Sequence, residues 1–356
     1  MMLFYHLFLI IFSSFVIWKV CNSFQTASLF LGQKMPTGTR GASINAIGSS
    51  FPEFMTSFIA IFHYTHNDGV MFGIANTTGT VIYNITVIPF FVILACYFFN
   101  NLSKLRFERR ILIRDSLFLI FTQISLMTIL SVGKISLLSS IFLVLIYFLY
   151  LVIIFNAQNN HNVKSNFNLP KKKSLLKTIL DIDLFRLLFP YSKKINYKNS
   201  IIVLGISICL LYFACKILVS NSYVIGEILH IPSYLIAMTI TAIATSVPDT
   251  IISIKEARIN KFNDAITNAF GSNIFNISFC VGFPVMLYNL IYKTEILLSV
   301  SSLDCIHNLK FLSIALILLV MFIFINKSKK WITKSILLLS IYALFIIYIL
   351  DKIRNL

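Results

Sequence analysis

Two acidic side chains, Glu53 and Asp249, occupy matched places in long apolar stretches of this 356-residue chain. An ionised carboxylate in such a setting is costly unless a cation or a set of hydrogen bonds compensates it. Neither acid has a basic residue among the seven positions on its N-terminal side. We therefore expect the two carboxylates to bind a cation rather than to pair with a neighbouring basic residue.

Hydroxyl-bearing and small residues precede each acid at helical spacing. Residues three and four positions apart share one face of a helix. The face that leads to Glu53 or Asp249 carries two hydroxyls and an alanine: Ser50, Ser49 and Ala46 in one case, and Ser246, Thr245 and Ala242 in the other. Each acid also follows a proline, which removes one helical hydrogen bond. We expect this to free the carbonyl groups of Gly48 and Ala244 near the acids.

A second motif supplies neutral oxygen atoms. Thr80 and Asn84 are four residues apart, as are Ser272 and Asn276, so each pair shares a helix face. Calcium takes about six to eight oxygen ligands. Two carboxylates would neutralise one such divalent ion, and hydroxyl and carbonyl oxygens suit sodium. The repeated set favours ion binding over the packing role that polar residues also have in membrane helices.

Both motifs occur twice, in the same order and at nearly the same offset. Ala46-Ile-Gly-Ser-Ser-Phe-Pro-Glu53 matches Ala242-Ile-Ala-Thr-Ser-Val-Pro-Asp249, and Gly79-Thr-Val-Ile-Tyr-Asn84 matches Gly271-Ser-Asn-Ile-Phe-Asn276. The sequence therefore predicts two related halves, residues 1–155 and 199–356. A basic linker, residues 156–198, separates them, and we expect it to be a solvated cytoplasmic loop.

Composition indicates that these motifs lie in a membrane. Hydrophobic residues make up 58% of the chain and charged residues 12%, whereas a soluble domain has about 25% charged residues. Runs of roughly 20 apolar residues mark spanning helices. About ten are expected, at 3–21, 36–62, 70–99, 111–131, 133–155, 199–220, 229–254, 264–292, 308–326 and 332–351. The predicted fold is all-α and polytopic. Five spans in each half make the second half enter the membrane inverted, as in many secondary transporters.

The net charge of +17 reflects topology rather than a nucleic-acid partner. Most Lys and Arg residues fall in alternate loops, at 103–114, 156–198, 255–261 and 327–334. Basic loops stay cytoplasmic, so both termini are expected outside. We expect residues 3–21 to be a retained helix, because Lys19 follows the apolar run and a signal peptide carries its positive charge before it.

The motifs resemble the two α-repeats of the sodium/calcium exchanger family, the calcium/cation antiporters. The similarity covers residues 41–84 and 231–284, and the two-half layout extends it along the chain. Further details resemble the potassium-dependent branch of that family. They are Gly48-Ser-Ser-x-Pro-Glu53, an Asp at position 249, Arg114-Asp115 at the start of the fourth span, and Ile225-Gly-Glu227.

This resemblance implies a sodium-driven calcium antiporter that works by alternating access. We therefore expect a transporter rather than an enzyme, and no cofactor. It places Glu53 and Asp249 at the central calcium site. The remaining matched residues would line the calcium and sodium sites: Ala46, Ser49, Ser50, Thr80, Asn84, Ala242, Thr245, Ser246, Ser272 and Asn276. The expected partners are the lipid bilayer and the two ions, for a monomer in the plasma membrane or in an organellar membrane.

Two positions depart from the family pattern. Position 276 is Asn where the potassium-dependent branch has Asp, so we expect transport without potassium. Position 244 is Ala where the family usually has Gly. Three alternatives stay open. The first is a calcium/proton or other divalent-cation exchanger on the same fold, and the second is a transport-inactive relative. The third is an intramembrane aspartyl protease, whose two acids would form a close dyad that shares a proton.

Overall fold

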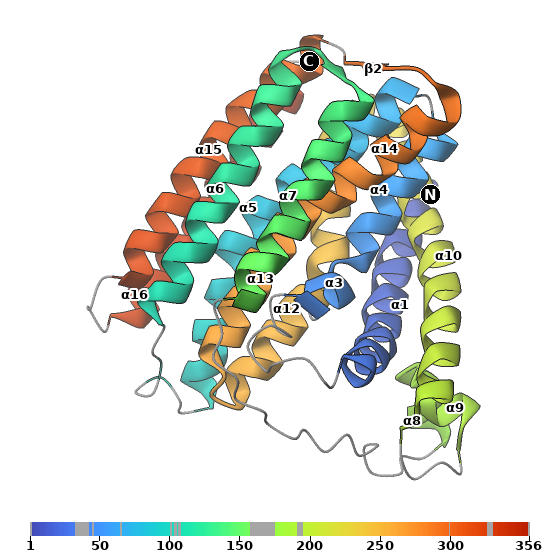
Figure 1. Ribbon diagram of the computed structural model, residues 1–356, viewed down its shortest axis with the longest axis vertical. Coiled ribbons are helices and arrows are strands. Elements are labelled where there is room, and N and C mark those ends of the chain that lie inside the picture. The colour runs from blue at the N-terminus through green and yellow to red at the C-terminus, as the bar shows by residue number, and fades with distance from the viewer. Residues whose placement is uncertain are drawn as a thin grey trace.

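The computed structural model describes residues 2–32, 43–44, 46–64, 66–99, 102, 105, 108–156, 175–190, 195–298, 300–325 and 330–354. Nine helices within these residues are long and apolar enough to cross a membrane. They run side by side as a bundle (Figure 1). The prediction of an all-α polytopic membrane protein is confirmed.

The first half contains α1 (Met2–Leu31), α3 (Ala46–Ser49), α4 (Phe51–His63), α5 (His66–Phe98), α6 (Arg109–Ser131) and α7 (Leu137–Asn156). Helix α1 is longer than the expected span 3–21. The expected span 36–62 corresponds to α3 and α4, which are separate helices because the helical conformation is interrupted at Ser50. Its residues 36–42 and 45 lie outside the described residues.

The second half contains α10 (Tyr197–Leu229), α11 (Ser233–Ile236), the π-helix η3 (Ala237–Thr241) and α12 (Ala242–Arg258). It continues with α13 (Phe262–Phe275), the π-helix η4 (Asn276–Cys280), α14 (Val281–Tyr292), α15 (Val300–Ile325) and α16 (Trp331–Arg354). The expected span 199–220 ends too early, because α10 continues to Leu229.

The first helices of the two halves run in opposite directions. His6 near the start of α1 hydrogen-bonds to Asn221 near the end of α10, at 2.6 Å. Phe30 near the end of α1 packs edge-on against Tyr197, the first residue of α10. Since α1 opens the first half and α10 opens the second, this antiparallel pair agrees with an inverted repeat.

Part of the linker is folded, so the expected solvated loop is wrong for residues 175–190. These residues form α8 (Leu175–Leu180) and α9 (Leu184–Leu188). Asp181 between them forms an ion pair with Lys19 of α1 at 2.8 Å. The buried side chains of Leu184 and Phe185 join a small apolar cluster with α1 and α10. Residues 157–174 and 191–194 lie outside the described residues.

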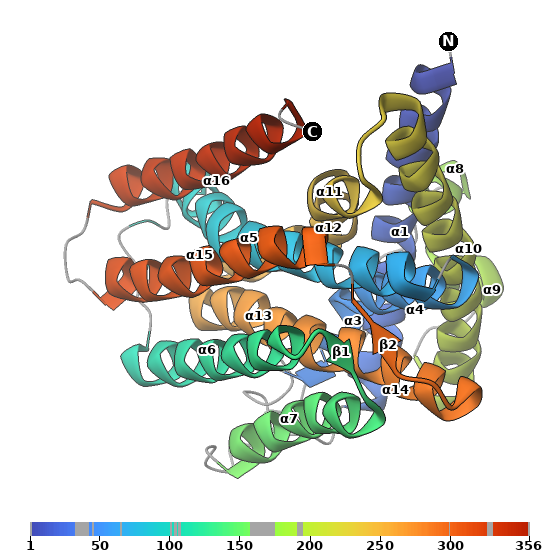
Figure 2. The ribbon, with the colours of Figure 1, turned by 90° about the horizontal axis from the view of Figure 1, so that it is seen from above.

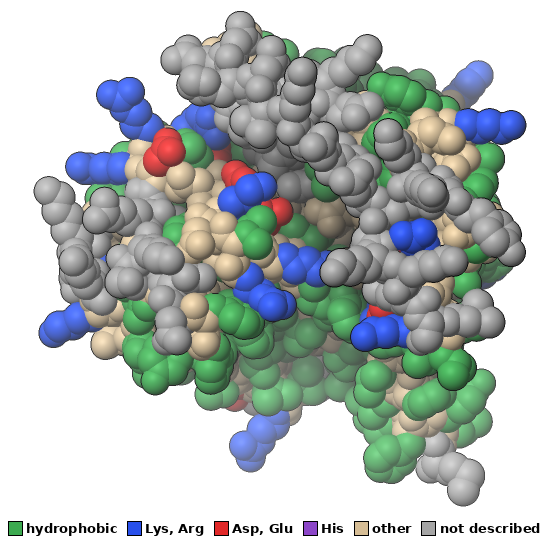
Figure 3. Space-filling model, turned by 90° about the horizontal axis from the view of Figure 1, so that it is seen from below, with side chains coloured by type: hydrophobic (Ala, Val, Ile, Leu, Met, Phe, Trp, Pro, Cys, Tyr) green, Lys and Arg blue, Asp and Glu red, His purple; other side chains and the backbone are tan. Residues whose placement is uncertain are grey.

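Two features mark the ends of the bundle. At the end where α8 and α9 lie, Lys and Arg side chains spread over the surface (Figure 3). At the other end, β1 (Lys134–Ile135) pairs antiparallel with β2 (Ile296–Leu297), a short ribbon that the all-α prediction omits. Lys134 and Glu295 form an exposed ion pair beside this ribbon at 2.7 Å.

Candidate cation site

Irregular helical backbone accompanies each acid. Ser50 interrupts the helix before Glu53, and Pro52 lies in the first turn of α4. Asp249 instead lies in a continuous helix, with Pro248 inside α12 and the π-helix η3 before it. Departures from regular helix at membrane depth occur where the backbone is buried in protein or lines a cavity. The two motifs are thus similar in sequence but are built differently.

The structure buries every residue that the sequence assigned to the site. The exposed fraction is 1% for Ala242 and 0% for the other members of the set: Glu53, Asp249, Ala46, Ser49, Ser50, Thr80, Asn84, Thr245, Ser246, Ser272 and Asn276. The two carboxylates lie close enough to interact electrostatically. Two acids of like charge, both removed from water, would repel each other strongly, and a bound cation would relieve that repulsion.

Asp249 is surrounded by hydrogen-bond donors from both halves. Its Oδ1 accepts from the Ser272 hydroxyl at 3.0 Å. Its Oδ2 accepts from Asn84 Nδ2 at 3.1 Å and from the Ser50 hydroxyl at 3.5 Å. Ser49 also lies beside this carboxylate. Two of the three donors, Ser50 and Asn84, come from the first half, so the site forms only when the two halves pack together.

Glu53 has a different environment. Neither of its carboxylate oxygens has a hydrogen-bond partner among the described residues. Thr245 of the second half lies beside it, but the Thr245 hydroxyl donates to the Ala242 carbonyl at 3.3 Å. A buried carboxylate without hydrogen bonds is unfavourable. Glu53 is therefore the group of the site that most needs a positive charge.

Further oxygen atoms of the site also lack partners among the described residues: Thr80 Oγ1, Asn84 Oδ1 and Ser246 Oγ. Buried polar atoms are nearly always hydrogen-bonded, so a group of exceptions needs an explanation. Carboxylate, hydroxyl and amide oxygens are the ligands that hard cations prefer. The donor set thus fits calcium or sodium.

Helix crossings hold the second motif against the first. A Cβ atom added to Gly79 on α5 would lie 1.9 Å from the Met238 carbonyl oxygen and 2.9 Å from the Ala242 Cβ. Only glycine allows this approach of α5 to η3, which brings the neighbouring Thr80 to the start of α12. Asn276 is positioned through Cys280, whose thiol donates to Asn276 Oδ1 at 3.5 Å and lies 4.0 Å from the Ser50 carbonyl oxygen.

The alanine at position 244 is accommodated. Ala244 packs near α1, where the Ser14 hydroxyl donates to its carbonyl at 3.0 Å. At the matched position, a Cβ added to Gly48 would come no closer than 3.6 Å to Gln25 of α1, an ordinary contact. The departure from the family pattern at position 244 therefore has no steric consequence that the structure reveals.

The sequence reasoning missed Asn273, which accepts from Asn84 Nδ2 at 3.0 Å and donates to the Val81 carbonyl at 3.4 Å. It lies inside the quoted Gly-Ser-Asn motif, and the matched residue of the first half is Val81. A polar residue matched to an apolar one inside a repeated motif was the signal that could have identified it.

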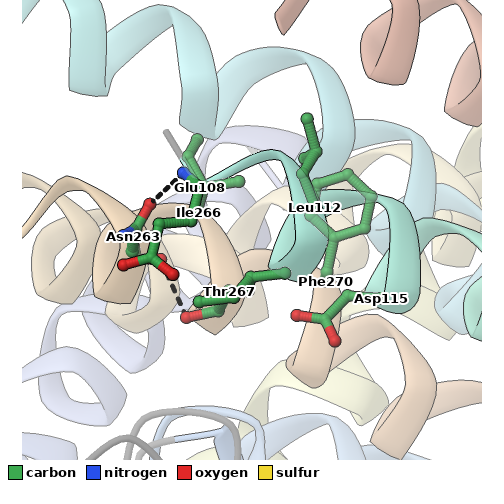
Figure 4. Close-up of a pocket in the computed structure, with 8 residues that line it drawn as sticks. Glu108, Leu112, Asp115, Asn263, Ile266, Thr267 and Phe270 are labelled. Atoms are coloured by element: carbon green, nitrogen blue, oxygen red, sulfur yellow. Dashed lines mark hydrogen bonds between the residues drawn. The ribbon is translucent and has the colours of Figure 1, made fainter. Parts of the chain in front are cut away.

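A second group of acids lies outside the site. Arg114 and Asp115 form an ion pair at 2.7 Å. Asp115 borders a small pocket between α6 and α13, together with Glu108, Leu112 and Phe270 (Figure 4). None of the candidate ligands lines this pocket, and its Asp115 carboxylate is already paired with Arg114, so the pocket is separate from the candidate site.

Comparison with known proteins agrees with this picture. The human sodium/potassium/calcium exchanger 5 is 33% identical over 133 residues, which make up 36% of this chain and 26% of that protein. The sodium/calcium exchanger MaX1 of Methanosarcina acetivorans is 25% identical over 162 residues, 43% of this chain and 41% of that protein. The matched part is thus well under two thirds of either relative.

The fold is similar to that of two solved exchangers along almost the whole chain. The H+/Ca2+ exchanger CAX superimposes with a TM-score of 0.63 at 13% identity, over 98% of this chain and 89% of that one. The sodium-calcium exchanger NCX_Mj gives 0.57 at 17% identity, over 97% and 98%. The family model described as sodium/calcium exchanger protein matches residues 4–156 and 199–350. With both halves matched, the chain is a member of the sodium/calcium exchanger family.

Proposed function

We propose that this protein exchanges sodium for calcium at a single central site formed by Glu53 and Asp249. The observation that carries the proposal is the pair of fully buried carboxylates, one from each half, among oxygen atoms that lack hydrogen-bond partners within the described residues. One calcium ion balances the two charges. Sodium ions would use the same carboxylates with the hydroxyl and carbonyl oxygens around them.

The packing of α1 and α10 supports alternating access. These two helices lie along each other at one side of the bundle, opposite α6, α15 and α16 (Figures 1 and 2). Helix α1 also contacts α12, and α10 contacts α4. The pair therefore touches both helices that carry the acids. Movement of this pair against the rest of the bundle would open the site to one side of the membrane at a time.

A calcium/proton exchanger is the second candidate, because the fold is also similar to that of the H+/Ca2+ exchanger CAX. The same carboxylates would then carry protons in place of sodium. An aspartyl protease fits less well, since Asp249 is held by Ser272, Asn84 and Ser50 and no hydrogen bond joins it to Glu53 among the described contacts.

We place the protein in the plasma membrane as a monomer, with an organellar membrane as the alternative.

Calcium-45 flux in proteoliposomes tests the proposal. Proteoliposomes that contain the purified chain are loaded with sodium and diluted into calcium-45. Their uptake is compared with that of vesicles without any gradient, of vesicles with only a proton gradient and of vesicles with only a potassium gradient. We expect uptake only with the sodium gradient. Uptake driven by the proton gradient alone would favour the calcium/proton exchanger, and no uptake under any gradient would favour a transport-inactive relative.

A further inference from the structure

Asn273 connects the two halves beside the proposed site without belonging to the matched ligands. Its side chain is fully buried on α13. Asn273 Nδ2 donates to the Val81 carbonyl at 3.4 Å, and its Oδ1 accepts from Asn84 Nδ2 at 3.0 Å. Val81 and Asn84 are both on α5, so two amides and one carbonyl form a short hydrogen-bonded relay between α5 and α13.

The donor-to-acceptor direction of the hydrogen bonds in this relay follows from chemistry alone. A backbone carbonyl can only accept, so Asn273 must turn its NH2 group toward Val81. Its oxygen then faces Asn84, which must in turn present its own NH2 group. The Val81 carbonyl thus orients Asn273 and, through it, Asn84, and an ionised Asp249, which can also only accept, favours the same orientation of Asn84.

The orientation decides which atom of Asn84 remains for a cation. Nδ2 lies between Asn273 and Asp249, at 3.0 and 3.1 Å. Amide bond lengths keep Oδ1 about 2.3 Å from Nδ2, so this oxygen stays next to Asp249. It is buried and has no hydrogen-bond partner among the described residues. An oxygen held in place beforehand binds a cation better than one that must first rotate.

The second half has no equivalent support. The residue matched to Asn273 is Val81, which has no polar side chain. Asn276, matched to Asn84, accepts only a weak hydrogen bond from the Cys280 thiol at 3.5 Å, and its Nδ2 lacks a partner among the described residues. The relay therefore serves one of the two amides.

We propose that Asn273 is a positioning residue that fixes the Asn84 oxygen toward the cation and so sets the calcium affinity of the exchanger. This inference rests on the proposed function. It assigns to Asn84 a stronger contribution than to Asn276, although the sequence repeats treat the two as equivalent. Asn273 itself does not touch the cation.

The test is a double-mutant cycle on the full-length protein. Asn273→Val carries the residue of the matched position and removes the relay, and Asn84→Ala removes the ligand oxygen. Calcium affinity by titration calorimetry and calcium-45 flux in proteoliposomes are measured for both variants and for their combination. Asn289→Val is the matched control, because Asn289 is a buried amide that donates to the Ile135 carbonyl at 3.3 Å away from the candidate ligands.

Loss of one hydrogen bond that orients a ligand should weaken calcium binding about tenfold. We expect Asn273→Val to raise the dissociation constant and the KM about tenfold while the maximal flux stays within about twofold. The combined variant should bind no more weakly than Asn84→Ala alone, because contributions made through one shared contact are not additive. The control should keep the wild-type affinity.

Three outcomes would contradict this. Unchanged affinity in Asn273→Val, or independent multiplying effects of the two substitutions, would overturn the role of Asn273 while leaving the exchange activity intact. A wild-type protein that does not bind calcium would overturn the proposed function as well. Should Asn273→Val fail to fold, as judged by gel filtration, Asn273→Ser replaces it. Its hydroxyl can accept from Asn84 but does not enforce the orientation, and an unchanged affinity there would equally refute the proposal.

Discussion

Neutralising the two carboxylates should have opposite effects on the stability of the protein without calcium. In Glu53→Gln a neutral amide of the same shape replaces a buried carboxylate whose oxygens have no hydrogen-bond partner among the described residues. At a pH at which Glu53 is ionised, removing such an uncompensated charge should raise the free energy of unfolding by about 1–3 kcal/mol.

Asp249→Asn should lower it, because the hydrogen bonds to Asp249 are already in place. The new NH2 group must replace one oxygen. At the Oδ2 position it would meet the NH2 group of Asn84, which cannot accept, so it must take the Oδ1 position and face the Ser272 hydroxyl. At least one charge-assisted hydrogen bond is then lost, at about 1.5–3 kcal/mol.

Both variants should lose the response to calcium. A ligand present at about 100 times its dissociation constant stabilises the folded state by about 2.7 kcal/mol. The assay is the unfolding temperature of the purified protein in detergent, with and without calcium, beside calcium-45 flux. The expected order without calcium is Glu53→Gln above wild type above Asp249→Asn, with flux abolished in both variants. If Glu53→Gln were the least stable of the three, or if either variant kept the calcium-induced rise, the reasoning would be refuted.

Three further predictions concern topology, ion dependence and packing. A cysteine engineered at position 172 should not react with an impermeant reagent applied to intact cells, and labelling there would contradict the predicted orientation. Sodium-driven calcium flux should persist without potassium, whereas Asn276→Asp should introduce a potassium requirement; loss of wild-type flux on potassium removal would contradict the interpretation of Asn276. Gly79→Ala should destabilise the protein by about 3 kcal/mol through its clash with Met238. The matched control Gly48→Ala should be tolerated, and equal unfolding temperatures for the two would refute the close crossing.

The sequence by itself determined the fold class, and it supplied the internal repeat and the residues of the candidate site as predictions. Hydrophobic runs and helical spacing are local properties, so Glu53 and Asp249 could be assigned to buried helix faces without a structure. The same holds for the family, because its motifs are short and contiguous. The ends of α1 and α10 were predicted too early, since lysine and other polar residues near a helix end do not stop the helix.

Only the tertiary structure decided how the members of the site divide between the two acids. Matched motifs suggested equal environments, yet Asp249 receives the donors Ser50, Asn84 and Ser272 while Glu53 has no hydrogen-bond partner among the described residues. Two of those donors are more than a hundred residues away in the chain. No local pattern encodes which of two similar acids they will reach.

The docking of α8 and α9 and the relay through Asn273 depend on packing in the same way. Asp181 reaches Lys19 only because α1 and the end of the linker meet in space. The orientation of Asn84 depends on a carbonyl group of Val81 that becomes available to Asn273 once α5 and α13 are in contact. Periodicity predicts which face of a helix is buried, but the partner on that face, and the direction in which its hydrogen bonds run, are settled when the two halves come together.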